Sequence, residues 1–129
     1  MSGDIIQILI VDDHELVRKS LMAMLSREPD MEVVGTAVNG REAIQSAQAL
    51  SPDVIIMDVS MPVLDGIRAA GEIKSLAIPT QIIMLSMHYN NALLQEARKH
   101  GACGYVIKQE VSNALIPAIR AAHEGTLVL

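Results

Sequence analysis

Five side chains that could carry out chemistry each follow or end a short apolar run of the sequence. They are, in chain order, Asp12, Asp13, Asp58, Ser86 and Lys108. Taken singly, each has an ordinary structural explanation, such as a helix cap or a solvated turn. Taken together, three carboxylates, a hydroxyl and an ammonium group in this pattern are the strongest indication of a functional site in the sequence.

Regular elements must position these residues, and the sequence predicts ten of them. Short runs rich in β-branched residues alternate with longer stretches of helical period. The predicted strands are Ile5–Val11, Glu32–Val38, Val54–Asp58, Gln81–Leu85 and Cys103–Ile107. Helices are predicted around Leu16–Leu25 and over Arg41–Leu50, Ile67–Ser75, Asn90–His100 and Asn113–Glu124. Five strand–helix pairs in strict order indicate an α/β fold, with a parallel sheet covered by helices on both faces.

The predicted sheet brings the five side chains to one edge. In an open parallel sheet, ligands bind at the carboxyl ends of the strands, near the point where the strand order reverses. Two unit charges about 4 Å apart repel by roughly 4 kcal/mol at an effective dielectric of 20. We therefore expect a cation among Asp12, Asp13 and Asp58, and oxygen ligands favour Mg²⁺ over zinc. The four histidines lack the spacing of metal ligands, and His100 and His123 are expected at helix ends.

Composition narrows the class of protein. The 129 residues fit one domain, and ten basic against fifteen acidic side chains give a net charge of −5. That balance argues against direct binding of nucleic acid, because Lys and Arg supply most of the non-specific affinity. The single cysteine, Cys103, is expected to be a buried apolar residue in a reducing compartment. No signal peptide or membrane-spanning run is apparent, so a cytoplasmic location is predicted, without membrane contact.

The motifs together resemble the receiver domain of two-component response regulators. The resemblance is carried by Asp12-Asp13, by Asp58-Val59-Ser60-Met61-Pro62 with Asp65-Gly66, by Ser86, and by Tyr105 three residues before Lys108. It covers the chain from about Ile5 to Gly125. The segments Val11–Arg18, Val33–Glu42 and Ser86-Met87-His88 look more particularly like receivers that precede a LuxR-type C-terminal helix-turn-helix.

This resemblance implies a fold and a set of roles. The fold would be a flavodoxin-like, doubly wound, five-stranded sheet of order 2-1-3-4-5 with five helices, as a single receiver domain over 1–129 without its effector domain. Asp58 would accept a phosphoryl group from a histidine kinase or phosphotransfer protein. Asp13, Asp58 and the carbonyl of Ser60 would ligate Mg²⁺, while Asp12 holds a metal-bound water. Lys108 and Ser86 would contact the phosphoryl oxygens.

The resemblance also implies how the signal leaves the site. Ser86 would move toward the phosphoryl group, and the ring of Tyr105 would turn into the space it vacates. The surface of the last two helices and the last strand would then change, for an output DNA-binding domain or for a second copy in a homodimer. Such a chain is a regulatory switch rather than an enzyme, apart from self-catalysed phosphotransfer and slow autodephosphorylation.

One departure from the family, one prediction about the last helix and two alternatives accompany this interpretation. Gln109 stands where the family often has proline, so a trans peptide bond is expected there. Pro117 is predicted to distort the start of the last helix, if Ser112 caps it. A phosphohydrolase of the haloacid dehalogenase type would need a second Asp two residues after its nucleophile, where this chain has Ser60. The other alternative is an interaction domain that has kept the fold and lost the switch.

Overall fold

A computed structural model describes residues 4–125 of the chain. The strands are β1 (Ile6–Val11), β2 (Met31–Ala37), β3 (Val54–Asp58), β4 (Gln81–Ser86) and β5 (Gly104–Ile107). The helices are α1 (Glu15–Ser26), α2 (Gly40–Leu50), α3 (Gly66–Ser75), α4 (Asn91–Lys99) and α5 (Val111–His123). A short 3₁₀ helix, η1 (Lys108–Glu110), joins β5 to α5. The predicted strands and helices are all present.

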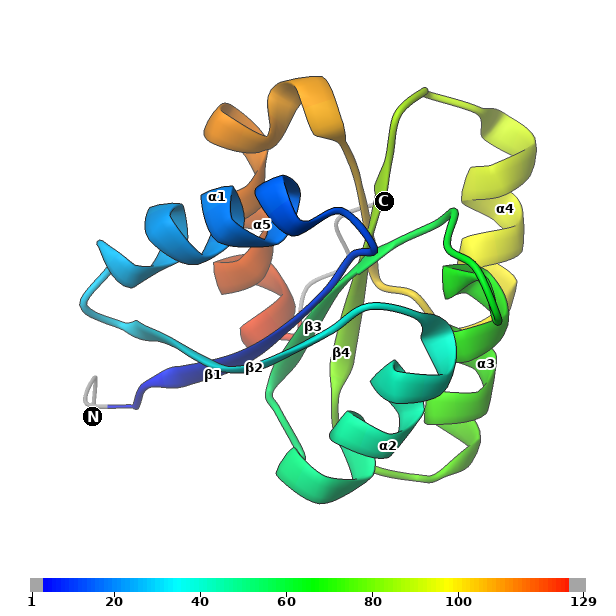
Figure 1. Ribbon diagram of the computed structural model, residues 1–129, viewed down its shortest axis with the longest axis horizontal. Coiled ribbons are helices and arrows are strands. Elements are labelled where there is room, and N and C mark those ends of the chain that lie inside the picture. Colours follow the sequence, from blue (N-terminus) through cyan, green and yellow to red (C-terminus); the bar gives the residue numbers. More distant parts are fainter. Residues whose placement is uncertain (1–3, 126–129) are drawn as a thin grey trace.

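The five strands form one parallel sheet in the order β2-β1-β3-β4-β5. The chain therefore moves outward from β1 to β2 and then crosses to β3 on the other side, so the strand order reverses between β1 and β3. Figure 1 shows α1 and α5 on one face of this sheet and α2, α3 and α4 on the other. The predicted doubly wound, flavodoxin-like fold is confirmed.

The sheet has a separate apolar core on each face. Side chains alternate along the central strands, so that Ile8 and Ile10 pack with α1 and α5, and Leu9 and Val11 pack with the other three helices. Every residue of β3 is buried. Burial on both faces explains why these strands appear in the sequence as continuous apolar runs. Close packing on both faces therefore fixes the strand ends that carry the polar residues.

The last helix differs most from its prediction. It begins at Val111 after η1, with Glu110 at the N-cap position and no side-chain cap, so the condition that Ser112 caps the helix is not met. Pro117 lies inside the helix, where its missing N–H leaves the carbonyl of Asn113 without its usual helical donor. The helix nevertheless continues to His123, and Leu115 and Ile119 on either side of the proline pack into the core.

Two further expectations concern local features. No peptide bond within residues 4–125 is cis, which includes the bond between Lys108 and Gln109, as predicted. Cys103 is buried, and this burial raises the pKa of its thiol, which fits the predicted role as a small core residue. Over the same residues, none of the helices has the length and apolar character that crossing a membrane requires.

Candidate functional site

Asp12 directly follows β1, and both its backbone and its carboxylate form hydrogen bonds. Its N–H donates to the carbonyl of Ala37 at 3.1 Å, and its own carbonyl accepts from Nη1 of Arg18 at 2.8 Å. Oδ1 of its carboxylate accepts from the N–H of His14 at 2.9 Å. The side chain is fully buried. Asp12 is therefore a buried carboxylate whose position depends on β1, β2 and the start of α1.

Asp58 ends β3 next to Asp12 and is also buried, with 4 % of its surface exposed. Oδ1 of Asp58 lies 3.3 Å from the N–H of Ser60, which donates to it. Gly66 closes the following loop by donating its N–H to the carbonyl of Val59 at 2.9 Å. A Cβ on Gly66 would overlap the carbonyl oxygen of Asp58, so only glycine permits this close approach.

Lys108 crosses from the end of β5 to both acids. Its Nζ lies 3.0 Å from Oδ2 of Asp12 and 3.3 Å from Oδ2 of Asp58. Burial alone would lower the pKa of this ammonium group, but the hydrogen bond to Asp12 and the charge of Asp58 raise it. Lys108 is therefore a permanent cation between two buried carboxylates.

The charge at this edge is nevertheless unbalanced. Burial raises the pKa of Asp58, the nearby charge of Asp12 raises it further, and Lys108 and the N–H of Ser60 oppose these effects without cancelling them. Asp13 adds a third carboxylate close by. The site thus holds more negative charge than its one lysine neutralises.

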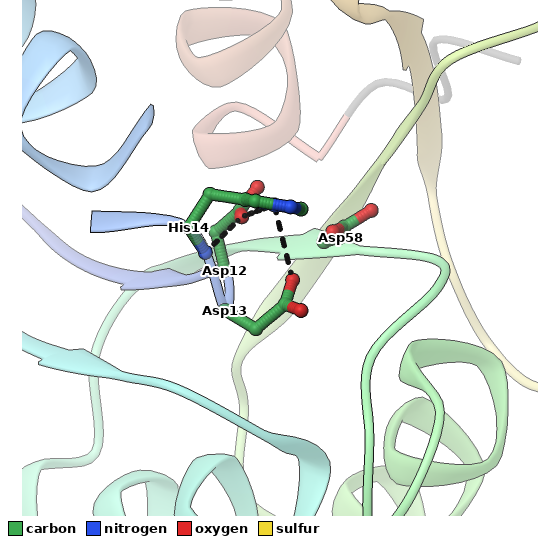
Figure 2. A group of neighbouring side chains, drawn as sticks. All are labelled: Asp12, Asp13, His14 and Asp58. Atoms are coloured by element: carbon green, nitrogen blue, oxygen red, sulfur yellow. Dashed lines mark hydrogen bonds and ion pairs between the residues drawn. The ribbon is translucent and has the colours of Figure 1, made fainter. Parts of the chain in front are cut away.

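The carboxylates have the geometry of a cation site. Oxygen atoms of Asp12, Asp13 and Asp58 and a ring nitrogen of His14 all lie within 4.8 Å of one another. Figure 2 shows His14 between Asp12 and Asp13, with Asp58 beside them. Nδ1 of His14 is 3.2 Å from an oxygen of each neighbouring Asp, yet Oδ1 of Asp13 is buried and accepts no hydrogen bond. A buried carboxylate oxygen that accepts no hydrogen bond and lies among other carboxylates fits a hard cation such as Mg²⁺.

His14 was not predicted at this site. His14 does not stand at the spacing of metal ligands from another histidine, and it enters the cluster as the residue after Asp12-Asp13. It stands at the N-cap position of α1 without making a side-chain cap. The ordinary explanations for two predicted residues also fail, because Asp13 does not cap α1 and Asn90, rather than Ser86, caps α4.

Ser86 and Tyr105 meet at one backbone carbonyl. Oγ of Ser86 donates to the carbonyl of His88 at 3.0 Å, and the hydroxyl of Tyr105 donates to the same oxygen at 3.2 Å. Ser86 lines the hollow that also contains Asp58, Ser60 and Lys108. Tyr105 lines a different hollow, toward α5. The carbonyl of His88 therefore connects Ser86, in the hollow that contains Asp58, to Tyr105, in the hollow toward α5.

Comparison with known proteins identifies the family. Residues 8–120 match the response regulator receiver domain, and the chain belongs to this family. It is 36 % identical over 124 residues to the transcriptional regulatory protein LnrK of Bacillus subtilis. The aligned region covers 96 % of this chain and 56 % of LnrK. It is 39 % identical over 120 residues to LiaR, another transcriptional regulatory protein of that species, covering 93 % of this chain and 57 % of LiaR.

A solved structure places the chain within this family more closely. A two-component response regulator of the LuxR family from Aurantimonas superposes with a TM-score of 0.93 at 31 % identity, covering 98 % of this chain and 90 % of the other. The predicted similarity to the LuxR-type subfamily is confirmed. The chain spans little more than half the length of the curated relatives it matches.

Proposed function

We propose that this chain is a phosphorylation-dependent switch in which Asp58 accepts the phosphoryl group. The observation that carries the proposal is the buried, ionisable Asp58 between Lys108 and a cluster of carboxylates with an unpaired oxygen. Phosphoryl transfer needs little covalent assistance and much positioning and charge stabilisation. The two apolar cores that pack against β1 and β3 hold Asp12 and Asp58 in position.

The residues of the acidic edge have different proposed roles in binding Mg²⁺ and the phosphoryl group. Asp13, Asp58 and the backbone carbonyl of Ser60 are the proposed Mg²⁺ ligands, and Asp12 holds a metal-bound water. When bound, Mg²⁺ supplies positive charge to the transferring group and keeps Asp58 ionised. Lys108 already lies 3.3 Å from Oδ2 of Asp58, where it can pair with an oxygen of the incoming phosphoryl group.

Ser86 and Tyr105 are the proposed switch. If the hydroxyl of Ser86 donates to a phosphoryl oxygen, it gives up its bond to the carbonyl of His88. The hydroxyl of Tyr105 shares that acceptor, so its position responds to the change. The affected surface comprises α4, β5 and α5, and a second copy of the chain is one candidate to dock there as a homodimer.

The partners follow from the family. A histidine kinase or a phosphotransfer protein would supply the phosphoryl group to Asp58. Because the relatives are transcriptional regulators of greater length, we propose a LuxR-type DNA-binding domain as the output, with 1–129 as one receiver domain. A cytoplasmic location belongs to the same proposal, and so do self-catalysed phosphotransfer and slow autodephosphorylation as the only reactions.

One labelling experiment tests the proposal. Wild-type chain, Asp58→Asn and Asp65→Asn are incubated with a small acyl-phosphate donor and Mg²⁺, and the intact mass of each is measured. We expect one phosphoryl group on wild type and on Asp65→Asn, whose exposed Asn still caps α3. We expect none on Asp58→Asn, and none on wild type in excess chelator. Labelling of Asp58→Asn would refute the assignment of the acceptor.

A further inference from the structure

The loop between Asp58 and α3 is held by a residue from another part of the chain. This loop, residues 59–65, carries Ser60, and Leu64 lies near its far end. Gly40, the buried first residue of α2, donates its N–H to the carbonyl of Leu64 at 3.0 Å. The start of α2 is thus bonded to the backbone of the loop that follows the phospho-acceptor.

The approach of Gly40 leaves no room for a side chain. A Cβ at this position would overlap the carbonyl oxygen of Leu64 and lie 2.9 Å from its Cβ and 3.0 Å from its carbonyl carbon. These atoms belong to the backbone or are fixed directly to it, so no rotation of a side chain can relieve the overlap. Any larger residue at position 40 must displace either α2 or the loop.

The start of α2 cannot easily withdraw. Oδ1 of Asn39 accepts from the N–H of Glu42 at 2.9 Å, and Oε1 of Glu42 accepts from the N–H of Val38 at 3.1 Å. Asn39 is the N-cap residue of α2 and Val38 precedes it, so these two bonds fix the backbone on both sides of Gly40. The loop is therefore the partner that yields.

The loop itself is in a strained conformation. Val63 has a φ of 71°, in the left-handed region that β-branched residues rarely adopt. The N–H of Leu64 donates back to the carbonyl of Pro62 at 2.8 Å, which closes a tight turn around Val63. Such a backbone persists only where the surroundings determine it, and the bond from Gly40 is one of the contacts that do so.

We propose that Gly40 is a positioning residue for the phospho-acceptor site. Its N–H and its lack of a side chain fix Leu64, and through the loop backbone they fix the carbonyl of Ser60 and the carboxylate of Asp58. The inference rests on the proposed function, in which Ser60 and Asp58 hold Mg²⁺. Gly40 is not among the proposed ligands of Mg²⁺ or of the phosphoryl group, so a substitution there would act by moving the loop.

The test compares Gly40→Ala with Gly35→Ala and wild type. Gly35 lies in β2, where a Cβ would approach the end of the Leu50 side chain to 2.8 Å, which rotation can relieve, and would make ordinary contact with Leu9 at 3.5 Å. Mg²⁺ affinity is measured by calorimetry and Asp58 labelling by mass, at matched folded fractions. For Gly40→Ala we expect a fall of about ten-fold or more in labelling rate, with weaker Mg²⁺ binding, since small displacements at a reacting centre are costly. Gly35→Ala stays close to wild type.

The outcomes separate the two proposals. Failure of wild type to be labelled would overturn the proposed function. Normal labelling of wild type, together with wild-type affinity and rate in Gly40→Ala, would overturn the positioning role alone, even if that variant were less stable. If Gly40→Ala does not fold, the amide NMR shift of Gly40 in wild type is followed on adding Mg²⁺. It should move more than that of Gly35, and equal shifts would overturn the inference.

Discussion

Two ionic clusters in this molecule have almost the same composition but opposite properties. At the edge of the sheet, Lys108 lies between Asp12 and Asp58 with its side chain 15 % exposed. Where α5 passes the turn before β2, Arg120 is 2.7 Å from Glu28 and 3.0 Å from Asp30, with its side chain 44 % exposed. Each cluster is one cation with two carboxylates.

The directions of the pKa shifts in the two clusters differ with burial. In the outer cluster, the hydrogen bond from Arg120 lowers the pKa of Asp30. In the inner cluster, burial and the charge of Asp12 raise the pKa of Asp58 in spite of Lys108. The outer cluster is complete with the groups it has. The inner cluster is buried and lies beside Asp13, whose Oδ1 accepts no hydrogen bond within residues 4–125, so these carboxylates could hold a further cation.

Removing the inner cation should have the largest effect. In Lys108→Met, two buried carboxylates lose the ammonium group that lies beside both of them, and we expect the free energy of unfolding to fall by about 3 kcal/mol without Mg²⁺. Urea denaturation with and without Mg²⁺ measures this, and added Mg²⁺ should restore part of the loss. Lys99→Met, which removes an exposed ion pair with Glu96, serves as the control. An equal loss in both variants would contradict the comparison.

Removing one inner carboxylate should have the opposite sign. Asp58→Asn relieves repulsion from Asp12 and Asp13 while Lys108 keeps its bond to Asp12. We expect the metal-free free energy of unfolding to rise by on the order of 1 kcal/mol. Mg²⁺ should stabilise this variant less than wild type, because binding to the folded state alone adds stability. Destabilisation of the metal-free variant would show that the carboxylates do not repel.

Ser86→Ala tests how the inner cluster reaches the surface. The variant keeps Asp58 and Lys108, so it should still be labelled, but the carbonyl of His88 is left with Tyr105 alone. We expect a smaller change in the ring NMR shifts of Tyr105 on phosphorylation than in wild type. A complete reversal of a 1:99 equilibrium would need about 5.5 kcal/mol, so the change is partial even in wild type. Identical shifts in both proteins would exclude the coupling.

Altering the outer cluster should have the smallest effect, visible mainly in acid. The folded-state pKa of Asp30 lies below its ordinary value of 3.8, so its stabilising contribution is present above 3.8 and is lost as pH falls through the folded-state pKa. Arg120→Gln should remove that contribution, with a small loss at neutral pH, because exposed ion pairs are weak. Urea denaturation at neutral pH and below pH 3.8 measures the free energy of unfolding in both ranges. If the free energy of unfolding of Arg120→Gln depends on pH as in wild type, the ion pair between Arg120 and Asp30 does not contribute.

The parts of this structure that were predictable are those fixed by local pattern. Asp58 and Lys108 follow apolar runs, so the sheet rule places them together without knowledge of any contact. His14, Gly40 and Arg120 depend on partners brought close by folding, and Arg120 meets Asp30 across 90 residues. The start of α5 was missed for a similar reason, since η1 carries no side-chain cap to mark it.

Val63 has a consequence for engineering and for the natural variation that this position tolerates. An exposed β-branched residue with a φ of 71° has no compensating packing of its own. Glycine adopts that backbone without steric cost, and Asn or Asp with less cost than valine. Part of the relief is offset for glycine, because the unfolded chain gains freedom as well. Position 63 is therefore a place where the stability of the domain can be adjusted without altering any carboxylate of the site.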